Sequence, residues 1–180
     1  MMQRILLDQQ KIQIILHRLC CQLIERYGRL ENTVLVGLQP RGTFLLDRII
    51  KLLKYQYQIE DVQNGKLDVT FFRDDFRHSE KPMTANQNLM NVVIENRQVV
   101  LIDDVFFTGR SVRAALTAIE SYGRPSTIEL MVLVHRRFSR HLPIKPDYIG
   151  IQMDALVGDK VKVSWIENDE KDVVYLQKRT

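Results

Sequence analysis

Cysteine is scarce in this chain of 180 residues, and long hydrophobic runs are absent. The only two cysteines, Cys20 and Cys21, are adjacent on a predicted helix, so their side chains diverge around its axis. This spacing excludes a disulfide framework and offers no pair of metal ligands. No apolar stretch approaches the roughly 18 residues of a membrane-spanning helix, and the first residues lack the apolar core of a signal peptide. We therefore expect a cytoplasmic protein with no membrane partner.

The composition is ordinary for a globular protein, with 45% hydrophobic and 27% charged residues. The length suits one domain spanning 1–180. The net charge is +4, but segment 135–145 holds four lysine and arginine side chains and no acid. This basic segment could meet an anionic ligand, RNA or a partner subunit, or it could be a solvated loop.

Hydrophobic periodicity predicts helices that alternate with strands along the chain. Apolar residues at helical spacing predict three helices, over about 8–27, 45–53 and 110–121. Short apolar runs predict strands at 33–38, 66–72, 99–103, 128–134, 148–151 and 161–166. This order favours an α/β fold with a mostly parallel central sheet and helices on both faces. The sequence shows no internal repeat and no low-complexity linker.

A long polar segment, 73–95, separates two of the predicted strands and has little apolar periodicity. A loop of this length inside a compact domain is usually a lid or a binding loop rather than a plain connector. We therefore expect a flexible loop over about 73–95. A small hood that carries part of the site is expected over about 135–160.

The most informative stretch is 99–111, where an apolar run is followed by two carboxylates and then by a short turn into a helix. The first N–H groups of a helix lack intrahelical acceptors, and the helix dipole makes that end positive. Gly109 would let the backbone approach an anion closely, and hydroxyl groups nearby would add donors. The residues expected to bind a phosphate here are Phe107, Thr108, Gly109, Arg110 and Ser111.

The two carboxylates, Asp103 and Asp104, are expected where the strand ends, and they need a partner other than the phosphate because anions repel each other. They could accept hydrogen bonds from ribose hydroxyls or hold a divalent cation one sugar ring away. Strand, acidic pair and anion-binding turn together describe a site for a ribose 5-phosphate. The alternative is that the acids merely end a strand and that Thr108 caps a helix.

The stretch resembles the phosphoribosyl diphosphate (PRPP) motif of type I phosphoribosyltransferases, in which hydrophobic residues, an acidic pair and Thr-Gly-Arg-Ser occur in register. The wider chain is similar to the family of bifunctional pyrimidine-operon attenuation regulators and uracil phosphoribosyltransferases. Further matching pieces, in the same order, are Ile24-Glu25-Arg26, Val36-Gly37, Arg41-Gly42, Phe72-Arg73-Asp74-Asp75, Gly123-Arg124-Pro125-Ser126, Leu142-Pro143-Ile144 and Asp147-Tyr148-Ile149-Gly150.

The resemblance implies a Rossmann-like sheet and an enzyme that transfers 5-phosphoribose from PRPP to a nucleobase, with uracil favoured, giving UMP and pyrophosphate. It implies catalytic roles for Asp103 and Asp104, and Mg²⁺ held mainly through the substrate with these acids as candidate ligands. It also implies a homo-oligomer of at least two chains. One alternative is a regulator that binds messenger RNA and senses nucleotides in the same pocket. Another is a different sugar-phosphate binder, although the chain lacks a Gly-x-Gly-x-x-Gly turn.

The resemblance places the pyrophosphate in a second strand-to-helix turn. Such a turn can present backbone N–H groups and an arginine to an anion, but the proline in it removes one donor. The alternative is a plain connecting turn. The residues implied in pyrophosphate binding are Gln39, Pro40, Arg41 and Gly42, with Arg73 joining as the long loop closes.

The base site is expected just after strand 128–134, at His135, Arg136 and Arg137, together with Ile149 on a later strand. Family members usually carry an acid, an arginine and a glycine in that order at the first three of these positions. The base that this chain prefers therefore stays open at this point.

For the RNA-binding alternative, the resemblance points to a basic face built partly from the first helix. The residues implied are His17, Arg18, Arg26 and Lys145. However, Cys21 and Ile151 stand where polar or basic groups are expected, and losing such contacts would weaken phosphate binding.

Overall fold

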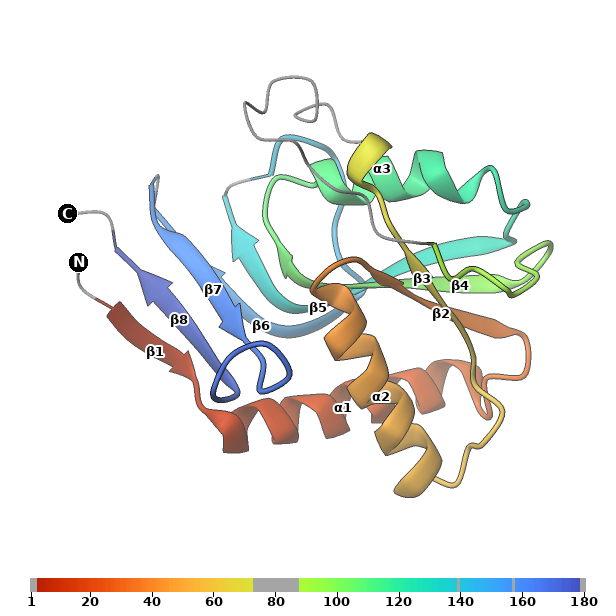
Figure 1. The fold of residues 1–180 in the computed structure, drawn as a ribbon, viewed down its shortest axis with the longest axis horizontal. Coiled ribbons are helices and arrows are strands. Elements are labelled where there is room, and N and C mark those ends of the chain that lie inside the picture. The colour runs from red at the N-terminus through yellow and green to blue at the C-terminus, as the bar shows by residue number, and fades with distance from the viewer. Residues whose placement is uncertain (1–2, 73–87, 139, 157, 179–180) are drawn as a thin grey trace.

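The computed structural model describes residues 3–72, 88–138, 140–156 and 158–178 (Figure 1). The helices are α1 (Gln9–Tyr27), α2 (Gly42–Tyr55) and α3 (Arg110–Ile119), with one short 3₁₀ turn at Thr70–Phe72. The strands are β1 (Gln3–Leu7), β2 (Thr33–Leu38), β3 (Gln63–Leu67), β4 (Gln98–Phe106), β5 (Thr127–Arg137), β6 (Tyr148–Asp154), β7 (Lys160–Ser164) and β8 (Val173–Gln177).

Five strands form a parallel sheet in the order β3-β2-β4-β5-β6. Helices α1 and α2 cover one face of this sheet and α3 covers the other (Figure 1). Every residue of β2 is buried, as expected of a central strand covered on both sides. The expected α/β fold, with a mostly parallel sheet and helices on both faces, is confirmed.

Two hydrophobic cores lie on the two faces of this sheet, because successive side chains of a strand point to opposite sides. Leu35 and Ile102 pack with α1 and α2, whereas Val36 and Leu101 pack with α3. Apolar stripes at helical spacing account for the helices. In α1 the buried residues are Ile12, Ile15, Leu16, Leu19, Cys20 and Leu23. The rigid sheet therefore fixes where β4 and β5 end.

A second, antiparallel sheet has the order β1-β8-β7 and brings the two chain ends together (Figure 1). We call this sheet the hood. The hood was expected over 135–160, but residues 135–137 extend β5, and β6 joins the parallel sheet. Strands β1 and β8 were not predicted, because these short end segments pair with each other across the whole chain and leave no local signal.

Several boundaries differ from those expected. The ladder between β4 and β5 continues through Asp103↔Val132 to Phe106↔His135, so both acids lie inside β4 rather than after it. The strand expected at 66–72 is found at Gln63–Leu67. Most of the expected flexible loop lies outside the described residues. Its end is described, and there Leu89 forms backbone hydrogen bonds of 3.0 and 2.9 Å with Lys66.

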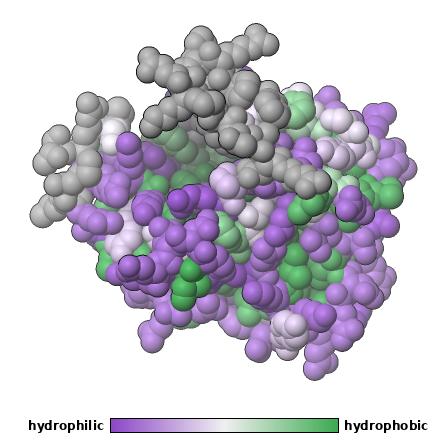
Figure 2. All heavy atoms as spheres, viewed as in Figure 1, coloured by the Kyte–Doolittle hydropathy of each residue, from purple (hydrophilic) through white to green (hydrophobic). Residues whose placement is uncertain are grey.

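The face of the molecule in Figure 2 is covered largely by hydrophilic side chains, with separate hydrophobic patches between them. Among the described residues, no helix combines the length and the apolar character needed to cross a membrane.

Candidate functional site

A cavity of about 470 Å³ opens where β4 ends and α3 begins. In parallel α/β sheets, ligands bind at this edge, beyond the carboxyl ends of the strands. The lining residues are Asp103, Val105, Phe106, Phe107, Thr108, Gly109, Arg110, Ser111, Val112 and His141. The structure therefore gathers Asp103 and all five residues of the predicted phosphate turn around one cavity. His141, which lies in the basic segment 135–145, was not predicted as a site residue.

The turn before α3 has the backbone that an anion site requires. Gly109 precedes the helix with φ of 89°, in the left-handed region that favours glycine. It has no side chain to cap the helix, so the positive end of α3 is directed at the cavity. The hydroxyl of Thr108 accepts a 3.4 Å hydrogen bond from the N–H of Arg110, which holds the turn in shape.

The turn is also held by the segment that follows β5. The N–H of His141 donates to the carbonyl of Thr108 at 2.9 Å. A Cβ atom built on Gly109 would lie 3.6 Å from both Leu142 and Phe106, at ordinary contact distance. The turn is therefore fixed from two sides, as preorganised binding requires.

The two acids of β4 have different surroundings. Asp103 is half-buried and lines the cavity, and its Oδ1 accepts a 2.9 Å hydrogen bond from the N–H of Asp104. Asp104 is 9% exposed, does not line the cavity and interacts with the charge of Arg41. Burial raises the pKa of Asp104, while Arg41 and the N–H of Val105 act in the opposite direction. Of the two, Asp103 is thus the one within reach of a ligand in the cavity.

The loop before α2 lies against the same stretch of β4. A Cβ atom on Gly42 would come within 2.3 Å of the Ile102 carbonyl oxygen and 3.0 Å of the Asp103 Cα atom, so only glycine fits here. The hydroxyl of Thr43 donates to the Pro40 carbonyl at 2.8 Å, and the Gln39–Pro40 peptide is cis. The predicted pyrophosphate loop therefore lies beside the acidic pair.

Arg41 of this loop was expected to face an anion. In the structure its guanidinium donates a hydrogen bond to the carbonyl of Val163 in β7. It also lies close enough to Asp104 and Asp169 to affect the pKa of each acid. Arg41 therefore connects the loop to the hood. Arg73, the other arginine predicted for pyrophosphate, lies outside the described residues.

The predicted base-site residues have separate surroundings and separate contacts. Arg137 forms a two-pronged ion pair with Asp154, with N–O distances of 2.6 and 2.8 Å, on the surface. His135 is buried, with its ring centroid 5.4 Å from that of Phe106. Burial, aided by nearby cations, lowers the pKa of His135, so the ring is neutral at neutral pH. Ile149 is half-buried, and its carbonyl faces α1.

Arg136 contacts Phe107, one of the residues that line the cavity. It is 6% exposed, and its guanidinium carbon lies 3.9 Å from the centroid of the Phe107 ring. Burial lowers the pKa of Arg136, and the charge of Asp159 acts against that effect. Of the four predicted base-site residues, Arg136 is the cation that touches a cavity-lining side chain.

The residues predicted for RNA binding are divided between two places. Arg18 donates to the carbonyls of Ile149 and Gly150 at the edge of β6, and Arg26 pairs with Glu129 at 3.2 Å. The imidazole of His17 lies 3.3 Å from the hydroxyl of Tyr57. Lys145 is exposed beyond β5, next to Ile144, which packs on the α3 face. Three of these four residues therefore lie on α1, and Lys145 lies in the segment between β5 and β6.

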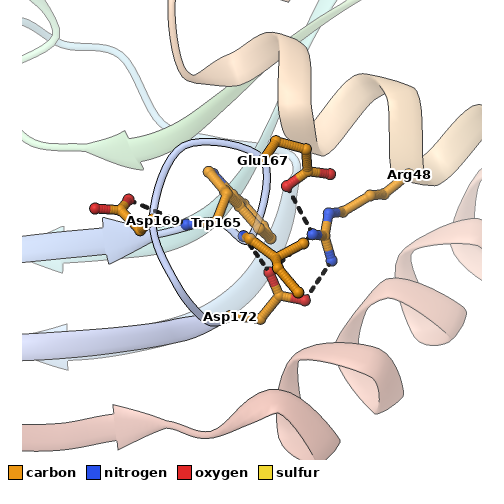
Figure 3. A network of polar contacts seen from close by, with 6 residues as sticks. Arg48, Trp165, Glu167, Asp169 and Asp172 are labelled. Carbon is orange, nitrogen blue, oxygen red and sulfur yellow. Dashed lines mark hydrogen bonds and ion pairs between the residues drawn. The ribbon is translucent and has the colours of Figure 1, made fainter.

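A network that the sequence did not reveal attaches the hood to α2 (Figure 3). Arg48 of α2 forms ion pairs of 2.7 Å with Asp172 and 2.9 Å with Glu167, and its guanidinium carbon lies 4.6 Å from the centroid of the Trp165 ring. The acids lie in the loop between β7 and β8, a stretch of the sequence that is rich in acidic residues. This network fixes the strand to which Arg41 is bonded.

Comparison with known proteins identifies the family of the chain. The family model described as "Phosphoribosyl transferase domain" matches residues 2–166 of this chain. The chain belongs to the phosphoribosyltransferase family. Within this family it is 39% identical over 178 residues to the "Bifunctional protein PyrR" of Pediococcus pentosaceus, covering 98% of this chain and 99% of that protein. It is 43% identical over 161 residues to the protein of the same name from Streptococcus mutans, covering 88% and 86%. The resemblance to the bifunctional family is confirmed.

Solved phosphoribosyltransferases share the fold. A hypoxanthine phosphoribosyl transferase from Trypanosoma cruzi matches with a TM-score of 0.72 and 14% identity, covering 97% of this chain and 91% of that one. One from Staphylococcus aureus matches with a TM-score of 0.65 and 22% identity, covering 85% and 79%. These likenesses are at the level of the fold.

Proposed function

We propose that this phosphoribosyltransferase transfers 5-phosphoribose from PRPP to uracil, giving UMP and pyrophosphate. The observation that supports this reaction is the cavity in which the amino end of α3 and its turn face Asp103. A phosphate bound at the turn would place the sugar ring toward this acid. Both groups come from the rigid edge of one sheet, which suits a reaction that depends on positioning.

In this proposal the chain's residues bind and orient the sugar while its anomeric carbon becomes positive. The phosphate turn holds the 5-phosphate, and the carboxylate of Asp103 accepts a hydrogen bond from a ribose hydroxyl and stabilises the developing charge. The loop at Gly42 lies directly beside Asp103, and the diphosphate would leave there. Exclusion of water prevents hydrolysis of the activated sugar.

We also propose that Mg²⁺ takes part. Carboxylate oxygens suit this ion, but the described residues contain no group of three or more acidic, histidine or cysteine side chains able to hold a metal. Asp103, which lines the cavity, would therefore hold it together with oxygens of PRPP, whereas Asp104, the other candidate ligand, does not line the cavity. The ion would supply charge neutralisation for the leaving diphosphate.

The test is to incubate the protein with labelled PRPP, Mg²⁺ and a panel of uracil, hypoxanthine, guanine and orotate. We expect UMP and pyrophosphate in equal amounts with uracil. Asp103→Asn should lower kcat/KM about 100-fold, because it removes a charge that acts in the transition state. Asp61→Asn, an exposed acid outside the cavity, is the matched control. A wild-type protein that forms no nucleotide with any base would contradict the proposal.

A second candidate function is binding of messenger RNA as a pyrimidine-operon regulator. It is favoured by the similarity over nearly the whole chain to proteins named bifunctional. The intramolecular partners of Arg18 and Arg26 weigh against it, because contacts to phosphate would compete with them. A filter-binding titration against a pyrimidine-operon leader tests it, and binding that weakens steeply with salt is the expected result.

We further propose a cytoplasmic protein that forms at least a homodimer, as is common for soluble enzymes. Sedimentation equilibrium of the purified chain tests the oligomeric state. A single species at the monomer mass of 21.2 kDa at all concentrations would contradict a dimer.

A further inference from the structure

Arg136 has an unusual position for an arginine. Its side chain is almost fully buried at the end of β5, and its guanidinium lies over the ring of Phe107. Phe107 is the first residue of the phosphate turn and lines the cavity, yet it remains 43% exposed. Arg136 is thus held against one wall of the cavity, next to a flat apolar surface.

One hydrogen-bond donor of Arg136 has no partner within the described part of the chain. Its Nε atom is buried without a hydrogen-bond partner there. Asp159 contributes a nearby opposite charge, but the Oδ2 atom of this acid accepts a hydrogen bond from the N–H of Leu156. A guanidinium carries five N–H donors and no acceptor, and buried donors in proteins are nearly always paired. The site therefore calls for an acceptor that comes from outside the described residues.

The surroundings of Arg136 limit which chemical groups could be that acceptor. The amino end of α3 already provides the site for a phosphate. The charge of Asp159 partly balances Arg136, which suits a partly negative oxygen better than a second full anion. The exposed ring of Phe107 beside it suits a flat heterocycle. An exocyclic amino group is excluded as the partner, because arginine cannot accept a hydrogen bond.

We infer that Arg136 is a base-binding residue that donates a hydrogen bond to an exocyclic oxygen of an oxopyrimidine such as uracil. This inference rests on the proposed function and names the residue that recognises the base. In the transfer, the bond between N1 of the base and C1′ forms, and the bond between C1′ and the diphosphate oxygen breaks. The electron pair goes to that oxygen, which also takes the N1 proton. As this proton leaves, negative charge spreads from N1 to the exocyclic oxygen of the base. Arg136 stabilises the negative charge on that oxygen.

The experiment compares Arg136→Gln with wild type using uracil and 5-fluorouracil, whose N–H groups are more acidic. We expect kcat/KM for uracil to fall about 10- to 100-fold, the range for a lost charged hydrogen bond, with the KM for PRPP unchanged. With 5-fluorouracil the fall in kcat/KM should be smaller, by a factor of about three or more, because this base carries negative charge more readily. A merely structural role would reduce the rates with both bases equally.

Arg29→Gln is the matched control, because Arg29 lies before β2, at the opposite end of the parallel sheet, and donates to the Gln58 carbonyl at 3.3 Å. Thermal melting shows whether each variant is folded. If Arg136→Gln does not fold, Arg136→Lys replaces it, since lysine keeps the charge but loses the planar fork. A selective loss with uracil would support the inference, and wild-type rates would overturn it.

Calorimetric titration of UMP separates the two claims. If wild type forms UMP and Arg136→Gln behaves like Arg29→Gln with both bases, the inference is overturned and the proposed function stands. If wild type forms no nucleotide, the proposed function fails, and weaker UMP binding by Arg136→Gln alone would still support the contact. In that case, equal UMP binding by wild type and both variants, or no UMP binding by any of them, would overturn the inference about Arg136.

Discussion

Two strand-to-helix turns flank the site, and they are built differently although each pairs a glycine with an arginine. In the turn before α3, Gly109 faces the cavity and Arg110 is exposed. In the turn before α2, Gly42 is pressed against the backbone of β4, and Arg41 is bonded to the hood. The first turn is open to a ligand, whereas the second is clamped between two parts of the protein. A glycine-arginine pair thus predicts a turn but not whether its arginine faces a ligand.

The largest effect is expected from removing the ion pairs that Arg48 forms with the hood. Arg48→Met should lower the free energy of unfolding by about 3–5 kcal/mol, because it leaves the buried carboxylate of Asp172 without its ion-pair partner and with only the hydrogen bond from the N–H of Ile166. Urea denaturation followed by circular dichroism measures this change. If the hood positions the α2 turn through Arg41, the KM for PRPP should rise as well. An unchanged unfolding midpoint would show that the network in Figure 3 contributes little.

The next largest effect concerns the close contact of the α2 turn. Gly42→Ala should destabilise the protein by about 3 kcal/mol, because the added methyl group would meet the Ile102 carbonyl at 2.3 Å and the backbone must shift. The shift would move β4 at Asp103, so kcat/KM should fall too. A variant with wild-type stability and activity would contradict the clamped description of this turn.

The open turn should tolerate the same substitution better. Gly109→Ala should cost about 1 kcal/mol, since the only penalty is the positive φ angle and the new methyl group would make ordinary contacts at 3.6 Å. Its main effect should be a higher KM for PRPP, because the turn must approach the phosphate closely. Parallel denaturation of this variant and Gly42→Ala tests the comparison directly, and equal losses would refute it.

These differences mark what the sequence could and could not predict. The turn Phe107–Ser111 was recognised because its residues are contiguous and its helix has a clear apolar stripe. That Asp103 lies inside β4 could not be predicted, because the strand is prolonged by pairing with β5, 29 residues further along the chain. The separation of Asp103 from Asp104 follows from the same pairing. The partners of Arg41 and Arg48 lie in the hood, where β1 at the start of the sequence pairs with β8 at its end.

The smallest predicted effect is a pH dependence from the other buried side chain at the end of β5. Burial lowers the pKa of His135. The folded state therefore binds a proton at this residue more weakly than the unfolded state, in which a histidine is protonated below about pH 6.5. The stability gained from this neutral ring is full above that pH and is lost as the pH falls toward the lower pKa of the folded state. His135→Gln cannot titrate, so its melting temperature should fall less than that of wild type between pH 7 and pH 5. The other three histidines are present in both proteins and cancel in this difference. If the melting temperatures of wild type and His135→Gln fell equally with pH, the imidazole of His135 would be accessible to protons. The cavity wall at Phe106 would then be more open than the α3 turn requires.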